Sequence, residues 1–253
     1  MDYATEPVTA LGRYFMQLRA RQTLAWCPGR SVLEIGPGRG VLATEALRLG
    51  KDYTALDCDP EVLRNLPMQA KRIFRRVPPI PDNVQYDAII AEAMLEHLGD
   101  YNQVCMFLES ARQALVPNGR LILRFPDVQL ARWLFWEYTP DHQYVTSLPR
   151  VAVILREQGW DIACSGYFVD CFTGWQAWCI DHLMRLLPTY VLHRLTGHAP
   201  HETSIWTKLR EKFPMTYVVA INATPLPAPR LRKATQPGCE RPEYAHAGPV
   251  TRL

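Results

Sequence analysis

Apolar residues occur along this chain in two alternating arrangements. Short, nearly continuous apolar runs are separated by segments in which apolar residues recur at the spacing of a helix. Buried strands are expected from the runs at 31–35, 53–57, 72–77, 86–91, 120–125, 160–169 and 215–222. Helices are expected at 8–26, 41–49, 60–66, 102–115 and 148–158. Strands that alternate with helices favour an α/β fold with a parallel sheet covered on both faces.

The chain divides into three parts. Residues 1–30 are expected to form a helical lid, residues 31–223 the α/β domain, and residues 224–253 a tail. About 45 residues separate the last two expected strands, far more than a hairpin needs, so 172–212 is interpreted as a helical insertion. The tail contains six prolines with little periodicity, and we expect it to be disordered.

Charge and composition exclude several classes of protein. The net charge of +3 resides entirely in residues 224–253, so the folded body is neutral and we expect no nucleic-acid partner. The seven cysteines include no C-x-x-C pair, which favours free thiols in a reducing cytoplasm over a disulfide framework or a zinc site. No apolar run approaches the ~20 residues of a membrane span, so no transmembrane segment is expected.

The most specific motif is the sequence VLEIGPGRG at 32–40. Gly36, Gly38 and Gly40 follow the end of an expected strand and precede a helix. Glycines at this place permit a tight turn and let a ligand approach the backbone. A dinucleotide fingerprint would need Gly or Ala at the position of Val41. A cofactor without a pyrophosphate, carrying an amino acid, fits a loop headed by Glu34 better.

Acidic residues end the second expected strand, in the sequence ALDCDP. Asp57 stands where a carboxylate can accept both hydroxyl groups of a ribose. Asp59 precedes Pro60 and is interpreted as a helix cap.

With these motifs the sequence resembles the class I S-adenosylmethionine-dependent methyltransferases over roughly 31–170 and the last strand. The segments AIIAEAMLEHL and ARQALVPNGRLILRFP are also similar to that family. The resemblance implies a Rossmann-like, doubly wound, mostly parallel seven-stranded sheet with an antiparallel last strand. It also implies S-adenosyl-L-methionine as cofactor. The implied cofactor-binding residues are Glu34, Gly36, Gly38, Gly40, Asp57, Cys58 and Glu92.

At the adenine end the chain departs from the family. Many members carry an acidic residue after the third strand to meet the adenine amine, whereas this chain carries Arg75 and Arg76. Asp82 or backbone groups would have to take that role.

The segment after the fourth strand resembles small-molecule O-methyltransferases of the ubiquinone and natural-product type, and also terminal RNA 2′-O-methyltransferases. Some of these enzymes bind a divalent metal through E-x-x-E-H. Here Ala93 occupies the position of the first Glu, and Glu92 stands one residue before it. Only Glu96 and His97 of the motif are present. We therefore expect no metal.

Two histidines are the best candidates for a general base, because imidazole titrates near neutrality. His142 belongs to the sequence D-H-x-x-x-x-S after the fifth strand, and its alternative role is a capping or exposed loop residue. His97 has the alternative role of supporting the cofactor loop.

The expected acceptor is a small, partly apolar molecule, hydrophobic or lipid-linked, methylated on a hydroxyl oxygen. Trp175 and Trp178 would share one face of a helix in the insertion and form an apolar wall, either as a lid over the acceptor or as core. RNA or protein methylation, and a non-catalytic partner subunit, are the alternatives. The sequence does not indicate an oligomeric state.

Overall fold

The computed structural model describes residues 10–81, 83–131, 134–137, 141–169, 171–177, 179–180 and 215–222. Its strands are β1 Ser31–Ile35, β2 Asp52–Asp57, β3 Lys71–Phe74, β4 Tyr86–Glu92, β5 Leu115–Pro126, β6 Asp161–Val169, β7 Phe172–Thr173 and β8 Met215–Ile221. Its helices are α1 Ala10–Ala25, α2 Val41–Arg48, α3 Pro60–Arg64, α4 Tyr101–Ala114, α5 Val128–Ala131, α6 Leu134–Glu137, α7 Leu148–Glu157 and the 3-10 turn η1 Leu95–His97.

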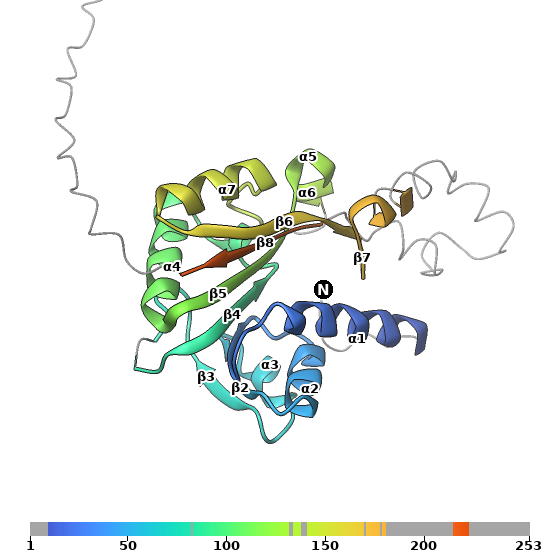
Figure 1. The fold of residues 1–253 in the computed structure, drawn as a ribbon, viewed down its shortest axis with the longest axis vertical. Helices are drawn as coiled ribbons and strands as arrows, with labels where there is room; N and C mark the ends of the chain where they lie inside the picture. Colours follow the sequence, from blue (N-terminus) through green and yellow to red (C-terminus); the bar gives the residue numbers. More distant parts are fainter. Residues whose placement is uncertain are drawn as a thin grey trace, which may run out of the picture.

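The strands form one sheet in the order β3-β2-β1-β4-β5-β8-β6-β7 (Figure 1). The first five strands in this order are parallel. Strand β8 lies between β5 and β6 and is antiparallel to both. The expected doubly wound sheet with an antiparallel last strand is therefore confirmed.

Two expected elements have slightly different bounds in the structure. The expected helical insertion began at 172, but Phe172 and Thr173 form an eighth strand because they pair with the end of β6. The helix expected at 102–115 ends at Ala114, and Leu115 instead pairs with Tyr86 of β4. Phe172 and Thr173 pair with Val169 and Phe168 across a tight turn, and two residues are too few to show the period of a strand. Leu115 is extended because it pairs with a strand far from it in the sequence.

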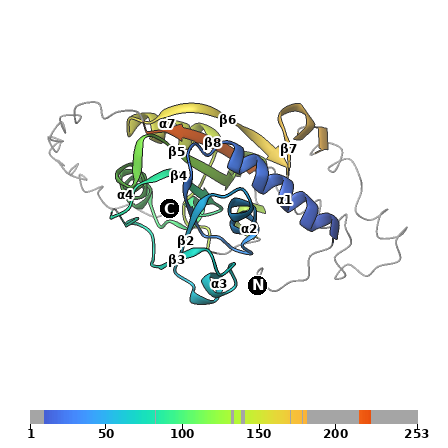
Figure 2. The same ribbon diagram turned by 60° about the horizontal axis from the view of Figure 1, so that its bottom comes forward.

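Helices cover both faces of the sheet, as Figures 1 and 2 show. Helices α1, α2 and α3 contribute Leu24, Ala43 and Leu63 to one buried cluster. Helices α4 and α7 contribute Phe107 and Leu155 to the other. Successive strand residues alternate between the two clusters, so the sheet has an α1–α2 face and an α4–α7 face.

Several predictions lie outside the described residues. They are those for Asp82, for Trp178, for most of the insertion and for the tail from 224 onward. Among the helices that the structure describes, none has the length and apolar content needed to cross a membrane.

Candidate cofactor site and active site

The glycine loop leaves β1 at the point where the sheet changes winding direction, between β1 and β4. Gly36 and Gly38 have φ angles of 71° and 49°, in the left-handed region that favours glycine. A Cβ atom added to either residue would meet no heavy atom within 4 Å. The backbone here is thus open to a ligand, at the crevice where open α/β sheets bind their ligands. This cradle fits the amino-acid end of S-adenosylmethionine.

Asp57 ends β2 beside this crevice. Its Oδ1 accepts a hydrogen bond from the Asp59 backbone N at 2.8 Å, and burial raises the pKa of its carboxyl. Asp59 in turn accepts from the Glu61 backbone N at 2.8 Å, which makes it the N-cap of α3 as predicted. Asp57 is therefore held in a fixed orientation at the carboxyl end of its strand, while the adjacent Cys58 is exposed.

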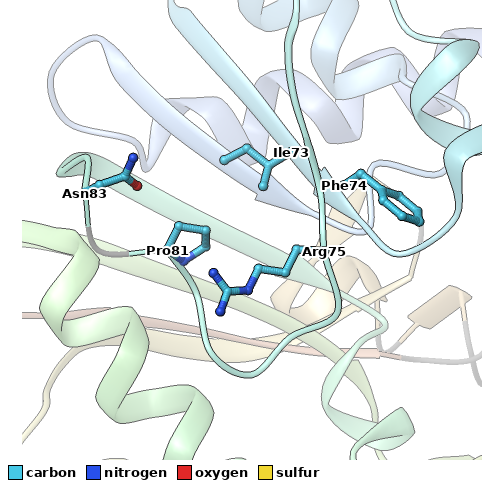
Figure 3. Close-up of a pocket in the computed structure, with 5 residues that line it drawn as sticks. All are labelled: Ile73, Phe74, Arg75, Pro81 and Asn83. Atoms are coloured by element: carbon cyan, nitrogen blue, oxygen red, sulfur yellow. The ribbon is translucent and has the colours of Figure 1, made fainter.

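A pocket of about 490 Å³ is lined by Ile73, Phe74, Arg75, Pro81 and Asn83 (Figure 3). It lies between β3 and the chain that leads to β4, and the Arg75 backbone N donates to the Asp57 carbonyl at 2.9 Å. Figure 3 shows Ile73 and Arg75 facing Pro81 across the opening. A flat, partly apolar group would fit here. Arg75, which stands where many family members carry an acidic residue, lines this pocket.

Two acidic residues approach the glycine loop from β1 and β4. Glu34 is buried and accepts a hydrogen bond from the Tyr53 hydroxyl. Burial raises the pKa of Glu34 to about 8, opposed by Tyr53 and reinforced by Glu92. For Glu92 burial acts in the same direction, but Arg19 and Arg124 outweigh it and hold the pKa of Glu92 below its ordinary value. At neutral pH, Glu34 is mostly protonated and Glu92 is ionised.

Two backbone hydrogen bonds bring the two candidate catalytic histidines together. The Glu96 carbonyl accepts hydrogen bonds from the backbone N atoms of Gln143 and Tyr144, at 2.8 and 3.0 Å. The rings of His97 and His142 then meet edge to face, with centroids 5.1 Å apart. This contact joins the turn after β4 to the segment before α7.

Each histidine is oriented through its Nδ1 atom. The Phe135 carbonyl lies 2.6 Å from His142 Nδ1, and the Asp141 carboxylate lies 3.0 Å from His97 Nδ1. A carbonyl or carboxylate oxygen can only accept, so both Nδ1 atoms donate and both neutral rings carry the lone pair on Nε2. Burial, opposed by Phe135, lowers the pKa of His142, which keeps this ring neutral at pH 7.

Glu96 completes the cluster. Its side chain is buried, and its Oε2 has no hydrogen-bond partner among the residues that the structure describes. Burial raises the pKa of this carboxyl to about 8. Glu96, His97 and His142 each offer one ligand atom, all within 4.8 Å of one another, so these residues could hold a divalent cation. The sequence predicts no metal because Ala93 replaces the first glutamate of the metal-binding motif. In the structure His142 offers a third possible ligand atom. The absence of a metal stays a prediction.

Sequence reasoning missed the residues that orient the site. Arg19, Asp141 and the Phe135 carbonyl contact Glu92, His97 and His142. The contacts of Arg19 with Glu92 and of Asp141 with His97 join segments far apart along the chain, so no local pattern shows them. The only signal in the sequence was the adjacency of Asp141 and His142.

Comparison with known proteins agrees with this fold. The family described as "Methyltransferase domain" matches residues 11–165, more than half of the 253 residues. The fold and the site define a class I S-adenosylmethionine-dependent methyltransferase. The chain belongs to the methyltransferase-domain family.

Among curated relatives, the ubiquinone biosynthesis O-methyltransferase of Xanthomonas oryzae pv. oryzae (strain PXO99A) is 29% identical over 132 residues, covering 48% of this chain and 53% of that protein. The mitochondrial ubiquinone biosynthesis O-methyltransferase of Schizosaccharomyces pombe (strain 972) is 31% identical over 105 residues, covering 38% of this chain and 37% of that protein. The chain thus spans about half the length, or less, of these relatives.

Solved structures share the fold. A SAM dependent methyltransferase from Archaeoglobus fulgidus aligns with a TM-score of 0.60 at 17% identity, covering 83% of this chain and 94% of that chain. The glycopeptide N-methyltransferase MtfA, complexed with S-adenosyl-L-methionine, aligns with a TM-score of 0.55 at 15% identity, with the same coverage of 83% and 94%. At these identities the likeness concerns the fold alone.

Proposed function

We propose that this chain transfers the methyl group of S-adenosylmethionine to a hydroxyl oxygen of a small, partly apolar acceptor. The observation that carries the proposal is the His97–His142 pair, whose two Nε2 atoms carry lone pairs beside the cofactor edge of the sheet. A hydroxyl group must lose its proton as it is methylated, so an oxygen acceptor needs a base at this place. The O-methyltransferases among the relatives support the same chemistry.

The cofactor's parts would be divided among the elements around the crevice. The glycine loop would hold the amino-acid end, Asp57 would accept the two ribose hydroxyls, and the pocket beside Arg75 would take the adenine. Bound S-adenosylmethionine supplies an electrophilic methyl group on its sulfonium sulfur.

The chain's own contribution to the reaction is positioning and proton removal. His142 Nε2 would take the proton of the acceptor hydroxyl, because the Phe135 carbonyl holds this ring in the tautomer that can accept. The Asp141 carboxylate would stabilise positive charge on His97 if that ring takes the proton instead. Two oriented imidazoles therefore allow proton transfer from acceptor hydroxyls in slightly different positions.

Aromatic side chains support a partly apolar acceptor. Phe15 of α1 and Phe172 of β7 meet with ring centroids 6.1 Å apart. Tyr14 and Trp175, close by in sequence, are 53% and 75% exposed. Large aromatic groups exposed on the surface are typical of binding sites for apolar ligands.

The test is a methyl-transfer assay with labelled cofactor against phenols, catechols, RNA and a protein extract. We expect transfer to a hydroxylated small molecule, lost by about 100-fold or more in His142→Gln with unchanged cofactor affinity. Glu109→Gln, a change at an exposed residue of α4, is the control. Methylation of RNA or protein only, or of an amine only, would contradict the proposal. Cofactor binding without transfer to any acceptor would favour a non-catalytic partner subunit.

A further inference from the structure

Four aromatic rings in successive contact lead from the candidate bases to the protein surface. The ring of His97 meets that of His142 with centroids 5.1 Å apart, and the His142 ring meets that of Phe135 at 4.7 Å. Phe135 in turn meets Trp136 at 5.2 Å with the ring planes at 70°, the edge-to-face arrangement that aromatic pairs prefer. The indole of Trp136 is therefore held in place relative to the His142 imidazole.

Phe135 joins the base to the indole in two ways. It belongs to α6, which lies on the same side of the sheet as α7 (Figure 1), and its side chain is 2% exposed. Its carbonyl accepts a hydrogen bond from His142 Nδ1 at 2.6 Å, while its ring contacts Trp136. One buried residue thus orients the base and supports the indole.

Trp136 is the member of this row that faces solvent. Its side chain is 49% exposed, whereas Phe135 beside it is buried. Single exposed aromatic residues are common on protein surfaces. Trp136 differs from such residues because a row of ring contacts fixes it with respect to a candidate base. An exposed indole at such a place offers a flat apolar surface to a molecule bound at His142.

We propose that Trp136 determines acceptor specificity by stacking with a planar apolar group that the acceptor carries beyond its hydroxylated part. The inference rests on the proposed function, which places the acceptor hydroxyl at His142 Nε2. Phe135 stands between the imidazole and the indole in the row, so an acceptor must extend past a single ring to reach both. Fused-ring and aryl-substituted hydroxy compounds have this shape. A simple phenol reaches the base without reaching the indole.

Three phenols test this specificity on the full chain. Phenol has one ring, 2-naphthol adds a planar second ring, and 5,6,7,8-tetrahydro-2-naphthol adds a saturated second ring that is not planar. We expect Trp136→Ala to raise KM for 2-naphthol by about 5- to 10-fold with kcat unchanged, because one aromatic contact is lost. KM for phenol should stay the same, and KM for the saturated analogue should rise less than KM for 2-naphthol. Trp136→Phe, which keeps a flat ring, should retain most of the affinity for 2-naphthol.

Tyr101→Ala is the matched control. Tyr101 is 44% exposed on α4, where its hydroxyl donates to Glu157 at 3.4 Å, so its loss should leave KM for all three phenols unchanged. Equal increases in KM for phenol and 2-naphthol in Trp136→Ala would overturn the proposal, because Trp136 would then act only through Phe135 and the base. An unchanged KM for 2-naphthol would overturn it as well. If Trp136→Ala does not fold, Trp136→Leu removes the flat ring and keeps an apolar side chain.

Calorimetry separates a failure of this inference from a failure of the proposed oxygen chemistry. The affinity for each phenol is measured in the presence of S-adenosylhomocysteine, so no turnover is needed. If 2-naphthol binds about 5- to 10-fold more weakly to Trp136→Ala than to the wild type and no phenol is methylated, the stacking role holds and the oxygen chemistry is wrong. If wild type and Trp136→Ala methylate all three phenols equally well, the oxygen chemistry holds and the stacking role is wrong. Absence of binding by every phenol would overturn the stacking role.

Discussion

His97 and His142 meet edge to face with ring centroids 5.1 Å apart, although α4, β5, α5 and α6 separate them along the chain. The contact depends on the Glu96 carbonyl, which accepts hydrogen bonds from the two residues that follow His142. One backbone oxygen thus sets the distance between the two candidate bases.

Asp141→Asn should separate the roles of the two histidines. Without the carboxylate 3.0 Å from its Nδ1, His97 loses the partner that orients its ring. If His142 is the principal base, methyl transfer should stay near the wild-type rate, and if His97 is, it should fall several-fold. Single-turnover rates measure this, with cofactor affinity as the check that binding is intact. A large loss in Asp141→Asn together with no loss in His142→Gln would assign the base to His97.

Asp57→Ala and Asp59→Ala are a matched pair of variants, because the first residue is expected in the cofactor site and the second caps α3. Asp57→Ala should weaken the affinity for S-adenosylmethionine by about 1–3 kcal/mol, because two hydroxyl groups lose a charged acceptor. Asp59→Ala should leave this affinity near normal but lower the free energy of unfolding by about 1 kcal/mol, because α3 loses its N-cap. Calorimetry and urea unfolding separate the two effects. Unchanged affinity in a folded Asp57→Ala variant would remove this residue from the site.

Glu34 and Glu96 should make the protein less stable as the pH rises. The pKa of each is raised from an ordinary 4.5 to about 8 by burial, so between these values the folded protein holds protons that the unfolded chain has released. The free energy of unfolding should therefore fall with rising pH, by up to about 1.4 kcal/mol per pH unit for each carboxyl. Glu96→Gln should flatten this dependence in urea titrations, whereas Glu61→Gln, an exposed control, should not. Parallel pH profiles for wild type and Glu96→Gln would contradict the burial argument.

Removal of metal tests the cluster of Glu96, His97 and His142. We expect methyl transfer to survive extensive treatment with EDTA, because the two imidazoles are oriented by Phe135 and Asp141 without any cation. Activity lost on chelation and restored by Mn²⁺ or Zn²⁺ would make these residues metal ligands and replace the general-base mechanism. Ca²⁺, which prefers oxygen ligands, is the control ion.

Trp175 should affect the acceptor and not the fold. Its side chain is 75% exposed, so Trp175→Ala should change the free energy of unfolding by less than about 0.5 kcal/mol. If it contacts the acceptor, KM for the acceptor should rise several-fold while cofactor affinity is unchanged. Trp160→Ala is the contrasting variant, because Trp160 is 2% exposed and its truncation should cost about 3–5 kcal/mol. Normal acceptor kinetics in Trp175→Ala would place the acceptor elsewhere.

The cofactor loop could be predicted because its determinants are local. Gly36 and Gly38 adopt left-handed backbone angles within one strand–loop–helix unit, and Asp59 caps α3 two residues after Asp57 ends β2. The strand β7 was missed because its two residues, Phe172 and Thr173, are too few to show the period of a strand before they pair with the end of β6. The start of β5 at Leu115 depends on its pairing with Tyr86.

The sequence by itself determined the class of protein, since the order of elements and the glycine loop depend on residues close together in the chain. Only the tertiary structure decided which charges and rings act together. Arg19 reaches Glu92 because α1 crosses the ends of β4 and β5, and His142 reaches His97 because the Glu96 carbonyl binds the segment that follows it. Contacts of this kind arise from how helices and strands pack on a shared sheet. The period of apolar residues indicates which face of an element is buried, but not which side chains will meet at the edge of the sheet.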